Sequence, residues 1–524
     1  MFTRQQIYTL LIVISAGLML GRIIAVNRTD MLEYQKTRFK TVNDTYNERE
    51  KQLREAGLSE SEFQKRFADL TQRRKQALEN EQRELPIFSA NDRSRWNTIR
   101  VLVEPDQRVQ RTVKLPDGTE RTETVWYAID KAQNIRGWDT IDMVKHDLPD
   151  QPGEGNQPGG GYLYSSKPPL LPTLMAIPYA LMYWTSDGKL SLEHEPFLIV
   201  RVMLIVCNLL PLVFGWFLLS LLIDRFGTTD WGRLFSVAFV CFGTFISTFA
   251  VTLNNHLPAV VSVTIALYCA VRIVYDKETR WRYYAIAGLF SAFAVACELP
   301  ALLFCVLLGT WLLWHQGKRT VLLFAPAALL VATAFFATNY IAHNTLIPAY
   351  GKKYVENSWY LYEYERGGRV LQSYWGNPSD LDKGEESIGT YVFHSTIGHH
   401  GLFSLTPVWV LSFVGLGCWL FDRQYRSLSA IILLTSVVVF VFYMRQPLHE
   451  RNYGGMTSAL RWLFWLAPLW SLALVAAADR FSRHGFWRIV ALLCLIVSVM
   501  SAAYPIWNPW AMPWAYNLLQ YVMP

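Results

Sequence analysis

The apolar residues of this chain gather in long uninterrupted runs, and this pattern limits the possible folds more than any other feature. Many of the runs are roughly 15 to 25 residues long, the length that an α-helix needs to cross the hydrocarbon core of a bilayer. A soluble core does not require such runs. The sequence, 52% hydrophobic over 524 residues, therefore predicts an α-helical polytopic membrane protein.

We expect about eleven transmembrane helices, with a large α/β extracytoplasmic loop after the first one. The first helix occupies 1–26 and is predicted to be uncleaved, with a cytoplasmic N-terminus, because no small-residue cleavage site follows it. Helices 2–7 lie in 198–341 and helices 8–11 in 403–504. The later spans are expected at 198–223, 233–253, 257–275, 283–297, 299–315, 320–341, 403–421, 427–444, 461–478 and 488–504.

The orientation of the spans is predicted from where the basic residues lie. Lys and Arg occur in the short loops near 225–233, 272–282, 318–319, 423–426 and 480–488, whereas the turn Asn254-Asn255-His256 has none. This is the positive-inside pattern. It also favours two short spans that meet at Glu298-Leu299-Pro300, because one long helix would leave some of the basic loops outside. The segments 27–197 and 342–402 and the tail 505–524 are then extracytoplasmic.

The first outer segment, 27–197, divides into three parts. Residues 31–85 are rich in charged residues and predict a solvated helical arm or a hairpin broken near Gly57. Residues 86–165 form a small mixed region, with β-type runs at 99–103 and 122–127 on either side of a turn at Pro116-Asp117-Gly118. Residues 168–184 are apolar but contain four prolines, which favours a helix along the membrane interface.

Charge and cysteine content exclude several functions. The net charge of +7 comes largely from loop Lys and Arg that set orientation, so we expect no nucleic-acid partner. All seven cysteines lie in apolar runs, which indicates packing residues rather than disulfides or metal ligands. No P-loop, dinucleotide-binding glycine pattern or HExxH motif is present.

Two motifs in the first outer segment carry candidate chemistry. Asp92 follows the charged arm in Ala90-Asn-Asp-Arg-Ser-Arg-Trp96, either as the N-cap of a helix or as a general base at the membrane surface. Lys167 stands in Tyr164-Ser-Ser-Lys-Pro-Pro169, either as an interfacial anchor or as a fixed cation for a phosphate at headgroup depth.

In this order, the motifs resemble the GT-C superfamily of integral membrane glycosyltransferases, which includes protein O-mannosyltransferases and the lipid A aminoarabinose transferase. Asp92 stands where that family has an acidic helix start, and Tyr164-Ser-Ser-Lys167-Pro-Pro matches its Y-x-x-K-P-P motif. A later R-[YW]-L-x-x-x-x-P pattern appears at Arg461–Pro468. The likeness covers roughly 86–470 in motif order and span layout. The chain departs from the pattern at Arg93, where the family has a second acidic residue, and at Glu298, where a basic residue is expected.

The resemblance implies a sugar transfer from a polyprenyl-phosphate-linked donor to a lipid, glycan or protein acceptor, with inversion. Asp92 would be the general base, and Lys167, Arg201 and Arg461 would bind the donor phosphate. Arg201 has a second interpretation, as a cation that snorkels from the outer end of its span. The uncleaved first span, the basic cytoplasmic loops and the absence of cysteines from the outer segments favour the cell inner (plasma) membrane as the location, with membrane lipids around the chain and the active site outside; a eukaryotic endomembrane is the alternative.

Further polar residues are candidates for contact with the acceptor or for metal binding. Asp139 and Asp142 are three residues apart and would share one face of a helix, although both also suit a solvated loop. Glu298 is an ionisable residue at membrane depth, which makes it a candidate by default. His256 would face the same cavity or serve as a hydrogen-bonded loop histidine.

His394, His399 and His400 fall within seven residues in the second outer segment. With Asp380 or Asp382 they would bind zinc or another divalent cation. They also suit hydrogen bonds to substrate or a structural role, because their spacing fits one helical face poorly. No cofactor is required by the sequence, and a divalent cation stays one possibility.

Three other functions stay open. A transporter or flippase would move polar or lipid-linked substrates, but the polar residues cluster in outer loops, and no internal repeat is visible. Another lipid-carrier enzyme, such as a polysaccharide ligase or polymerase, would also use outer Arg and His residues. A non-catalytic scaffold would use 31–85 as its interaction arm. The motif order favours the glycosyltransferase.

Overall fold

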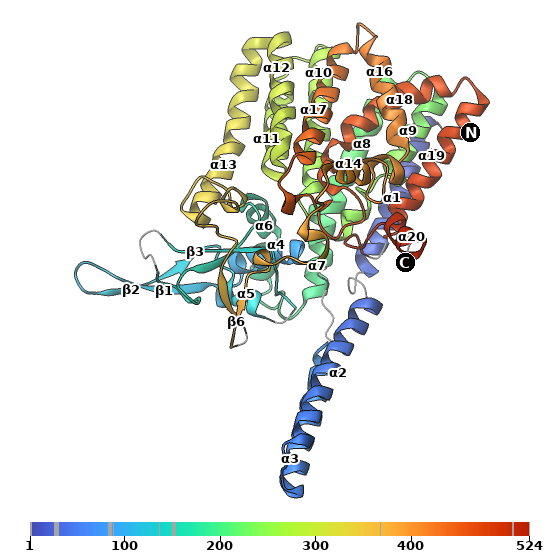
Figure 1. Cartoon of the computed structure of the whole chain (residues 1–524). Helices are drawn as coiled ribbons and strands as arrows, with labels where there is room; N and C mark the ends of the chain where they lie inside the picture. Colours follow the sequence, from blue (N-terminus) through green and yellow to red (C-terminus); the bar gives the residue numbers. More distant parts are fainter. Residues whose placement is uncertain are drawn as a thin grey trace.

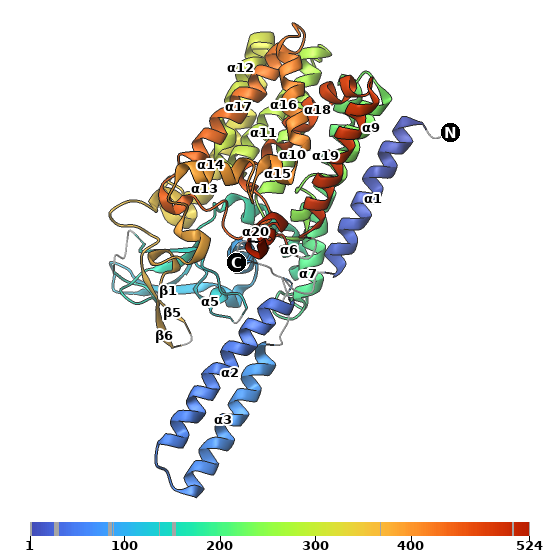
Figure 2. The ribbon, with the colours of Figure 1, turned by 45° about the vertical axis from the view of Figure 1, so that its right-hand side comes forward.

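The computed structural model describes residues 3–25, 31–81, 86, 89–135, 137–148, 153–366, 368–505 and 508–522. Its apolar helices stand side by side as a bundle (Figure 1). The strands and the charged arm lie beyond one end of this bundle and much of the second polar segment lies toward the same end, whereas several short loops between helices lie at the other end (Figures 1 and 2). The division of the chain into two polar sides is thus present in the fold.

Seven helical segments among the described residues are long and apolar enough to cross a membrane, which supports the membrane class. They are α1 (Arg4–Ala25), Pro196–Phe226, α10 (His256–Tyr275), Leu299–His343, α17 (Arg426–Met444), Arg461–Phe481 and α19 (Gly485–Ala503). Two shorter apolar helices, α11 (Trp281–Cys297) and α16 (Val408–Leu420), pack with them. The expectation of eleven spans stays a prediction.

Three of the long segments are composite. Pro196–Phe226 comprises α7 (Pro196–Leu204), a π-helical turn η2 (Ile205–Leu209) and α8 (Leu210–Phe226). Leu299–His343 comprises η4 (Leu299–Ala301), α12 (Leu302–Arg319), the π-helical turn η5 (Thr320–Phe324) and α13 (Ala325–His343). Non-helical torsion angles at Gln316 (φ −148°, ψ 60°) mark a kink within α12, near its C-terminal end. Arg461–Phe481 comprises the 3₁₀ helix η10 (Arg461–Leu466) and α18 (Ala467–Phe481).

Two sequence predictions about helix boundaries have clear outcomes. The break at Glu298 is confirmed, since α11 ends at Cys297 and Glu298 has extended torsion angles. The continuous span at 233–253 is wrong, because α9 (Asp230–Phe242) stops early and only the 3₁₀ turn η3 (Thr248–Val251) follows. The buried Asn208 amide explains this, since it donates to the carbonyls of Ala250 and Thr252 at 3.0 and 2.9 Å and satisfies the irregular backbone.

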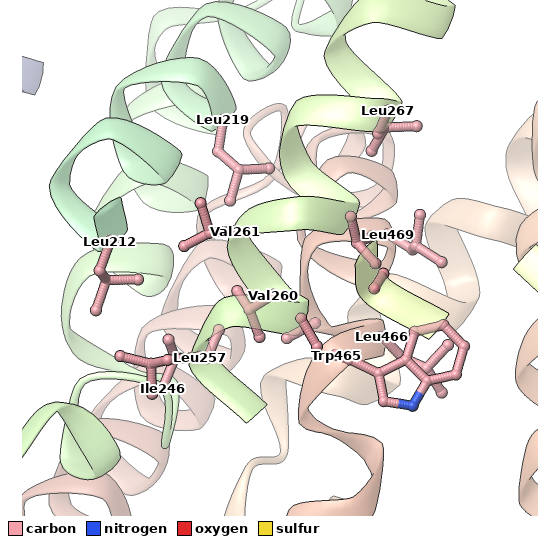
Figure 3. Packing of buried hydrophobic residues seen from close by; sticks show 14 of the residues in the cluster. Leu212, Leu219, Ile246, Leu257, Val260, Val261, Leu267, Trp465, Leu466 and Leu469 are labelled. Carbon is pink, nitrogen blue, oxygen red and sulfur yellow. The ribbon is translucent and has the colours of Figure 1, made fainter. Parts of the chain in front are cut away.

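The core of the bundle lies where α8, α10 and the η10–α18 segment meet. Leu212 and Leu219 of α8 face Val261 of α10, and the opposite side of α10 packs on Trp465 and Leu469 (Figure 3). Close approach also requires a residue without a side chain at Gly415 of α16, where an added Cβ would lie 2.0 Å from the carbonyl oxygen of Ala473. Dense packing of this kind gives the polar residues at the bundle end a rigid base.

The charged segment forms the predicted hairpin, and its residues 82–85 lie outside the described part. Helices α2 (Met31–Glu55) and α3 (Glu60–Glu81) run side by side and project from the body (Figure 2). Gly57 lies in the turn with a φ of +62°, a value that glycine adopts without strain.

The mixed region begins with α4 (Ala90–Val103). The β-type run predicted at 99–103 is wrong, because these residues form the last turns of this helix. After it come η1 (Pro105–Gln107), the antiparallel pair β1 (Val109–Lys114) and β2 (Glu120–Val125), α5 (Asp130–Asn134), the antiparallel pair β3 (Met143–His146) and β4 (Tyr162–Ser165), and α6 (Leu170–Thr185). The predicted hairpin around Pro116-Asp117-Gly118 is confirmed by β1 and β2.

The second polar segment and the tail complete the polar end. The segment contains η6 (Ala349–Lys352), the hairpin β5 (Glu363–Arg366) and β6 (Arg369–Gln372), η7 (Tyr374–Gly376), η8 (Asp380–Lys383) and α14 (Ile388–Thr396). The span expected at 403–421 is interrupted at Pro407, between α15 (Leu402–Leu405) and α16. The turn η9 (Leu448–Glu450) follows α17, and α20 (Trp514–Val522) lies in the tail.

Candidate functional site

The N-terminus of α4 holds Asp92 in a capping box. Ser89 is the N-cap, and its hydroxyl accepts from the backbone N–H of Asn91 at 3.1 Å. Asp92 returns the interaction, because its Oδ1 accepts from the backbone N–H of Ser89 at 2.6 Å. Its Oδ2 accepts from the hydroxyl of Thr252 at 3.0 Å, and the side chain is 1% exposed. Asp92 is therefore a buried capping residue at N3 rather than the N-cap itself.

The other end of α4 is fixed by a buried ionic network. Arg100 donates to Glu104 at 2.7 Å and to Glu193 at 2.8 Å, and Tyr179 of α6 donates to Glu104 at 2.5 Å. A hydrogen-bonded network of this kind holds the helix in one orientation. The direction in which α4 presents Asp92 is thus set from both ends.

Pairing between β3 and β4 brings Asp142 and Lys167 together. Met143 lies opposite Ser165, and one step farther the N–H of Ser166 donates to the carbonyl of Asp142 at 3.1 Å. The side chains then form an ion pair, with 2.9 Å between Lys167 Nζ and Asp142 Oδ1. The hydroxyl of Ser94 on α4 lies 2.5 Å from the Asp142 carbonyl oxygen, which ties the pair to the helix that carries Asp92.

Burial and charge act in opposite directions on this pair. Burial alone would raise the pKa of Asp142, but Lys167, Arg461 and Arg95 outweigh it, so the pKa of Asp142 lies below its usual value. Burial lowers the pKa of Lys167, and Asp142 opposes that shift. All three cations therefore favour the charged form of Asp142, although only Lys167 forms an ion pair with it.

Arg461, at the start of η10, is held by three groups. Its Nε donates to the carbonyl of Gly454 at 2.9 Å, in a loop where Gly454 has a φ of +97°. Its Nη1 lies 2.9 Å from Nε2 of His256, whose Nδ1 is hydrogen-bonded to Glu298. Its guanidinium carbon lies 5.1 Å from the ring centre of Trp510, a cation–π contact with the C-terminal tail.

Arg95 of α4 is also linked to the Glu298 carboxylate, in this case through Asn255. Its Nη2 donates to Oδ1 of Asn255 at 2.5 Å, and Asn255 Nδ2 donates to Glu298 at 2.7 Å. Its Nη1 also donates to the side chain of Asn91 at 2.6 Å. Burial lowers the pKa of Arg95 to about 10, and the neighbouring Arg461 adds to this shift.

Together these residues form what we name the cation cluster: Arg95, Lys167 and Arg461, with the carboxylates of Asp92, Asp142 and Glu298 around them. Arg95 is buried, whereas Lys167 and Arg461 are partly exposed. Three cations that repel one another in a buried setting are a ready site for an anion such as a phosphate. The structure thus brings together four of the predicted residues, Lys167, Arg461, Asp142 and Glu298, and sets Asp92 beside Arg95.

Asp139 and Arg201 have other surroundings. Asp139 lies 3.1 Å from Arg366 and 3.8 Å from Arg93, and the shared helical face predicted for Asp139 and Asp142 is wrong because the two residues lie in a non-helical loop before β3. Arg201 lies in α7, with its guanidinium carbon 5.5 Å from the ring centre of Phe197.

The three histidines of the second polar segment form a compact group. His394 of α14 stacks on His399 at 3.9 Å, and Nδ1 of His399 lies 2.5 Å from Nδ1 of His400. Because Nε2 of His400 donates to the carbonyl of Thr457 at 3.1 Å, its Nδ1 accepts from His399. Burial lowers the pKa of His399 to about 4 and that of His400 to about 3, so both are neutral, as this hydrogen-bond scheme requires.

The possible cation site at these histidines stays a prediction. Within the described ranges, no group of three or more His, Cys, Asp or Glu side chains has an arrangement suited to a metal ion. Asp382 accepts instead from Asn452 at 2.7 Å and from Tyr374 at 2.9 Å, and the side chain of Asp380 lies outside the described part.

A mostly apolar cavity of about 30 Å³ adjoins the histidine group. His400 lines it, as do Leu460 and Leu463 from the segment around Arg461. The cavity thus lies between the histidine group and the η10–α18 segment that begins at Arg461.

No family model, no curated protein and no solved structure matches this chain. The chemistry assigned to the site accordingly rests on its own residues.

Several site residues escaped the sequence interpretation. Arg95 stands three positions after Asp92, so it shares a helical face with it, and that spacing was a usable signal. Thr252 and Trp510 gave none, because nothing in the sequence indicates that the irregular turn after α9 and the C-terminal tail meet at this site.

Proposed function

We propose that this protein is a membrane glycosyltransferase of the GT-C type. It moves a sugar from a polyprenyl-phosphate-linked donor to an acceptor on the extracytoplasmic face of the inner (plasma) membrane, with inversion at the anomeric carbon. The observation that carries the proposal is the cation cluster, three cations with the buried carboxylates of Asp92, Asp142 and Glu298 around them, at the polar end of an apolar helix bundle. A phosphate attached to a membrane lipid is the anion that reaches such a site.

The cations act on the leaving group. Lys167 and Arg461, which are partly exposed, bind the donor phosphate, and Arg95 adds charge from behind them. As the bond between the anomeric carbon and the phosphate oxygen breaks, its electron pair remains on the phosphate, and the three cations stabilise the added negative charge. Lys167 exchanges Asp142 for the phosphate when the donor binds.

Asp92 acts on the acceptor. Its carboxylate removes the proton of the acceptor hydroxyl while that oxygen attacks the anomeric carbon from the face opposite the phosphate. The N–H of Ser89 keeps Oδ1 in place, and the acceptor hydroxyl takes the position beside Oδ2 that the Thr252 hydroxyl now occupies. Asp139 and the three histidines are left as candidates for contact with the acceptor, and Arg201 has no assigned step.

A transfer assay tests the proposal. The full chain in proteoliposomes is given a panel of radiolabelled polyprenyl-phosphate sugars together with an acceptor membrane extract. We expect one donor to lose its sugar to the acceptor and to release polyprenyl phosphate, and we expect K167M to abolish this transfer. The matched control is Lys114→Met in β1, a lysine that lies outside the site.

Each other outcome opposes the proposal. Passage of the intact donor across the bilayer indicates a transporter, and joining of the whole glycan together with release of polyprenyl diphosphate indicates a polysaccharide ligase or polymerase. Absence of any reaction across the panel contradicts the glycosyltransferase assignment.

A further inference from the structure

Glu298 lies at the break between α11 and α12, and both arginines of the cation cluster are linked to it through neutral side chains. Its carboxylate is 6% exposed and accepts from His256 and from Asn255. His256 leads to Arg461 and Asn255 leads to Arg95. The Glu298 carboxylate is thus linked to two of the three cations, in each case through one side chain.

The hydrogen-bond chemistry fixes the protons along the first of these routes. A guanidinium only donates, so Nε2 of His256 must accept from Arg461. The proton of the imidazole then resides on Nδ1 and is donated to Glu298. His256 is therefore neutral, and Glu298 is the final acceptor on this route.

On the second route, from Arg95 through Asn255 to Glu298, the hydrogen bonds run in the same direction. Asn255 accepts from Arg95 through its carbonyl oxygen and donates through its amide nitrogen to Glu298 and to the carbonyl of Cys297 at 3.1 Å. Among the described residues, no carboxylate forms a direct ion pair with Arg95 or Arg461, whereas Lys167 has one in Asp142. The two arginines are thus oriented by neutral acceptors, and neither guanidinium is in direct contact with a carboxylate that an incoming anion would have to displace.

We infer that His256, Asn255 and Glu298 are positioning residues. They hold the guanidinium groups of Arg461 and Arg95 in the orientation that binds a lipid phosphate. The inference rests on the proposed function, since it assigns the phosphate-binding geometry of that same site. Side chains that hold a charged donor through an intermediate residue usually affect affinity strongly without touching the ligand.

Binding of two lipids tests the inference. The full chain in nanodiscs is titrated with polyprenyl phosphate and with the polyprenol of the same length, and the ratio of the two affinities is the readout. In H256L no acceptor for Arg461 remains, whereas H256Q offers the carbonyl oxygen of glutamine. The matched control is Thr264→Val, a buried residue of the same helix whose hydroxyl bonds the carbonyl of Val260 at 2.8 Å.

We expect H256L to lower the preference for the phosphate lipid roughly ten- to hundredfold, the range associated with hydrogen bonds to charged groups. Affinity for the polyprenol stays unchanged, H256Q regains most of the preference, and T264V behaves as the wild type. An equal loss for both lipids in H256L, or an unchanged ratio, overturns the inference while leaving the proposed function in place. A wild-type protein that does not distinguish the two lipids overturns both.

Discussion

Lys167 and Asp142 form an ion pair across the ends of two antiparallel strands, with 2.9 Å between Nζ and Oδ1. The lysine is thereby held in place before any ligand arrives, and its partner is an anion that a phosphate can replace. Under the proposed function, a donor phosphate competes with Asp142 for Lys167.

This competition predicts opposite effects of the two partners on lipid-phosphate binding. Asp142→Asn removes the competing charge and should tighten polyprenyl phosphate binding roughly tenfold, while lowering the unfolding temperature because Lys167 loses its partner. Lys167→Met should weaken binding by a similar factor. Titration of the two variants in nanodiscs provides the measurement, and weaker binding in D142N would show that Asp142 supports the phosphate site rather than competing for it.

The assignment of the base predicts that Asp92 and Asp142 differ in kinetics. Asp92→Asn should lower the rate of sugar transfer about 10²- to 10⁴-fold. Its amide oxygen still accepts from the N–H of Ser89, so the unfolding temperature should change little. D142N should keep a measurable rate. If D92N transfers sugar at the wild-type rate, Asp92 is a capping residue only.

The histidine group predicts a loss of stability in acid. The pKa of His399 is about 4 and that of His400 about 3 in the folded chain, against an ordinary value of 6.5. Between about pH 6.5 and about pH 4, the two histidines are protonated in the unfolded chain but stay neutral in the folded chain. Proton binding therefore favours the unfolded state, and the unfolding temperature falls as the pH is lowered through this range. The double variant H399Q/H400Q should flatten this slope, measured by thermal unfolding in detergent. The exposed His449→Gln serves as control, and an unchanged slope in the double variant contradicts the explanation.

The orientation of the chain predicts which sites a membrane-impermeant maleimide can label. Glu120→Cys in β2 and Lys383→Cys in η8 should react in intact cells. Thr279→Cys and Gln424→Cys, in short loops at the other end of the bundle, should react only after permeabilisation, because the positive-inside pattern predicts that the basic loops are cytoplasmic. The unmodified chain provides the background from its seven native cysteines. Reversed labelling would place the cation cluster on the cytoplasmic side.

The sequence predicted the features that depend on local pattern. Apolar run length gave the helical membrane class, Gly57 gave the hairpin of the arm, and Glu298-Leu299-Pro300 gave the break between α11 and α12. The failures came from contacts across the chain. The helix expected to reach 253 ends at Phe242 because a distant amide, that of Asn208, satisfies the irregular backbone that follows.

In the site, too, the sequence predicted what depends on local pattern and missed what depends on contacts across the chain. Asp92, Lys167 and Arg461 were found through motifs, and Asp142 and Glu298 through their charge. The links between them depend on tertiary structure, since His256 has ordinary loop surroundings in the sequence and Trp510 comes from the tail. The role of the arm formed by α2 and α3 has no explanation in the contacts of the described residues.

A cryo-EM structure of the full chain bound to polyprenyl phosphate tests the proposed phosphate site most directly. The account predicts density for the phosphate between Lys167 and Arg461, with Arg95 behind it, the bond between Lys167 and Asp142 opened, and the lipid chain entering the apolar bundle. A phosphate bound elsewhere, with the Lys167–Asp142 pair still closed, would contradict it.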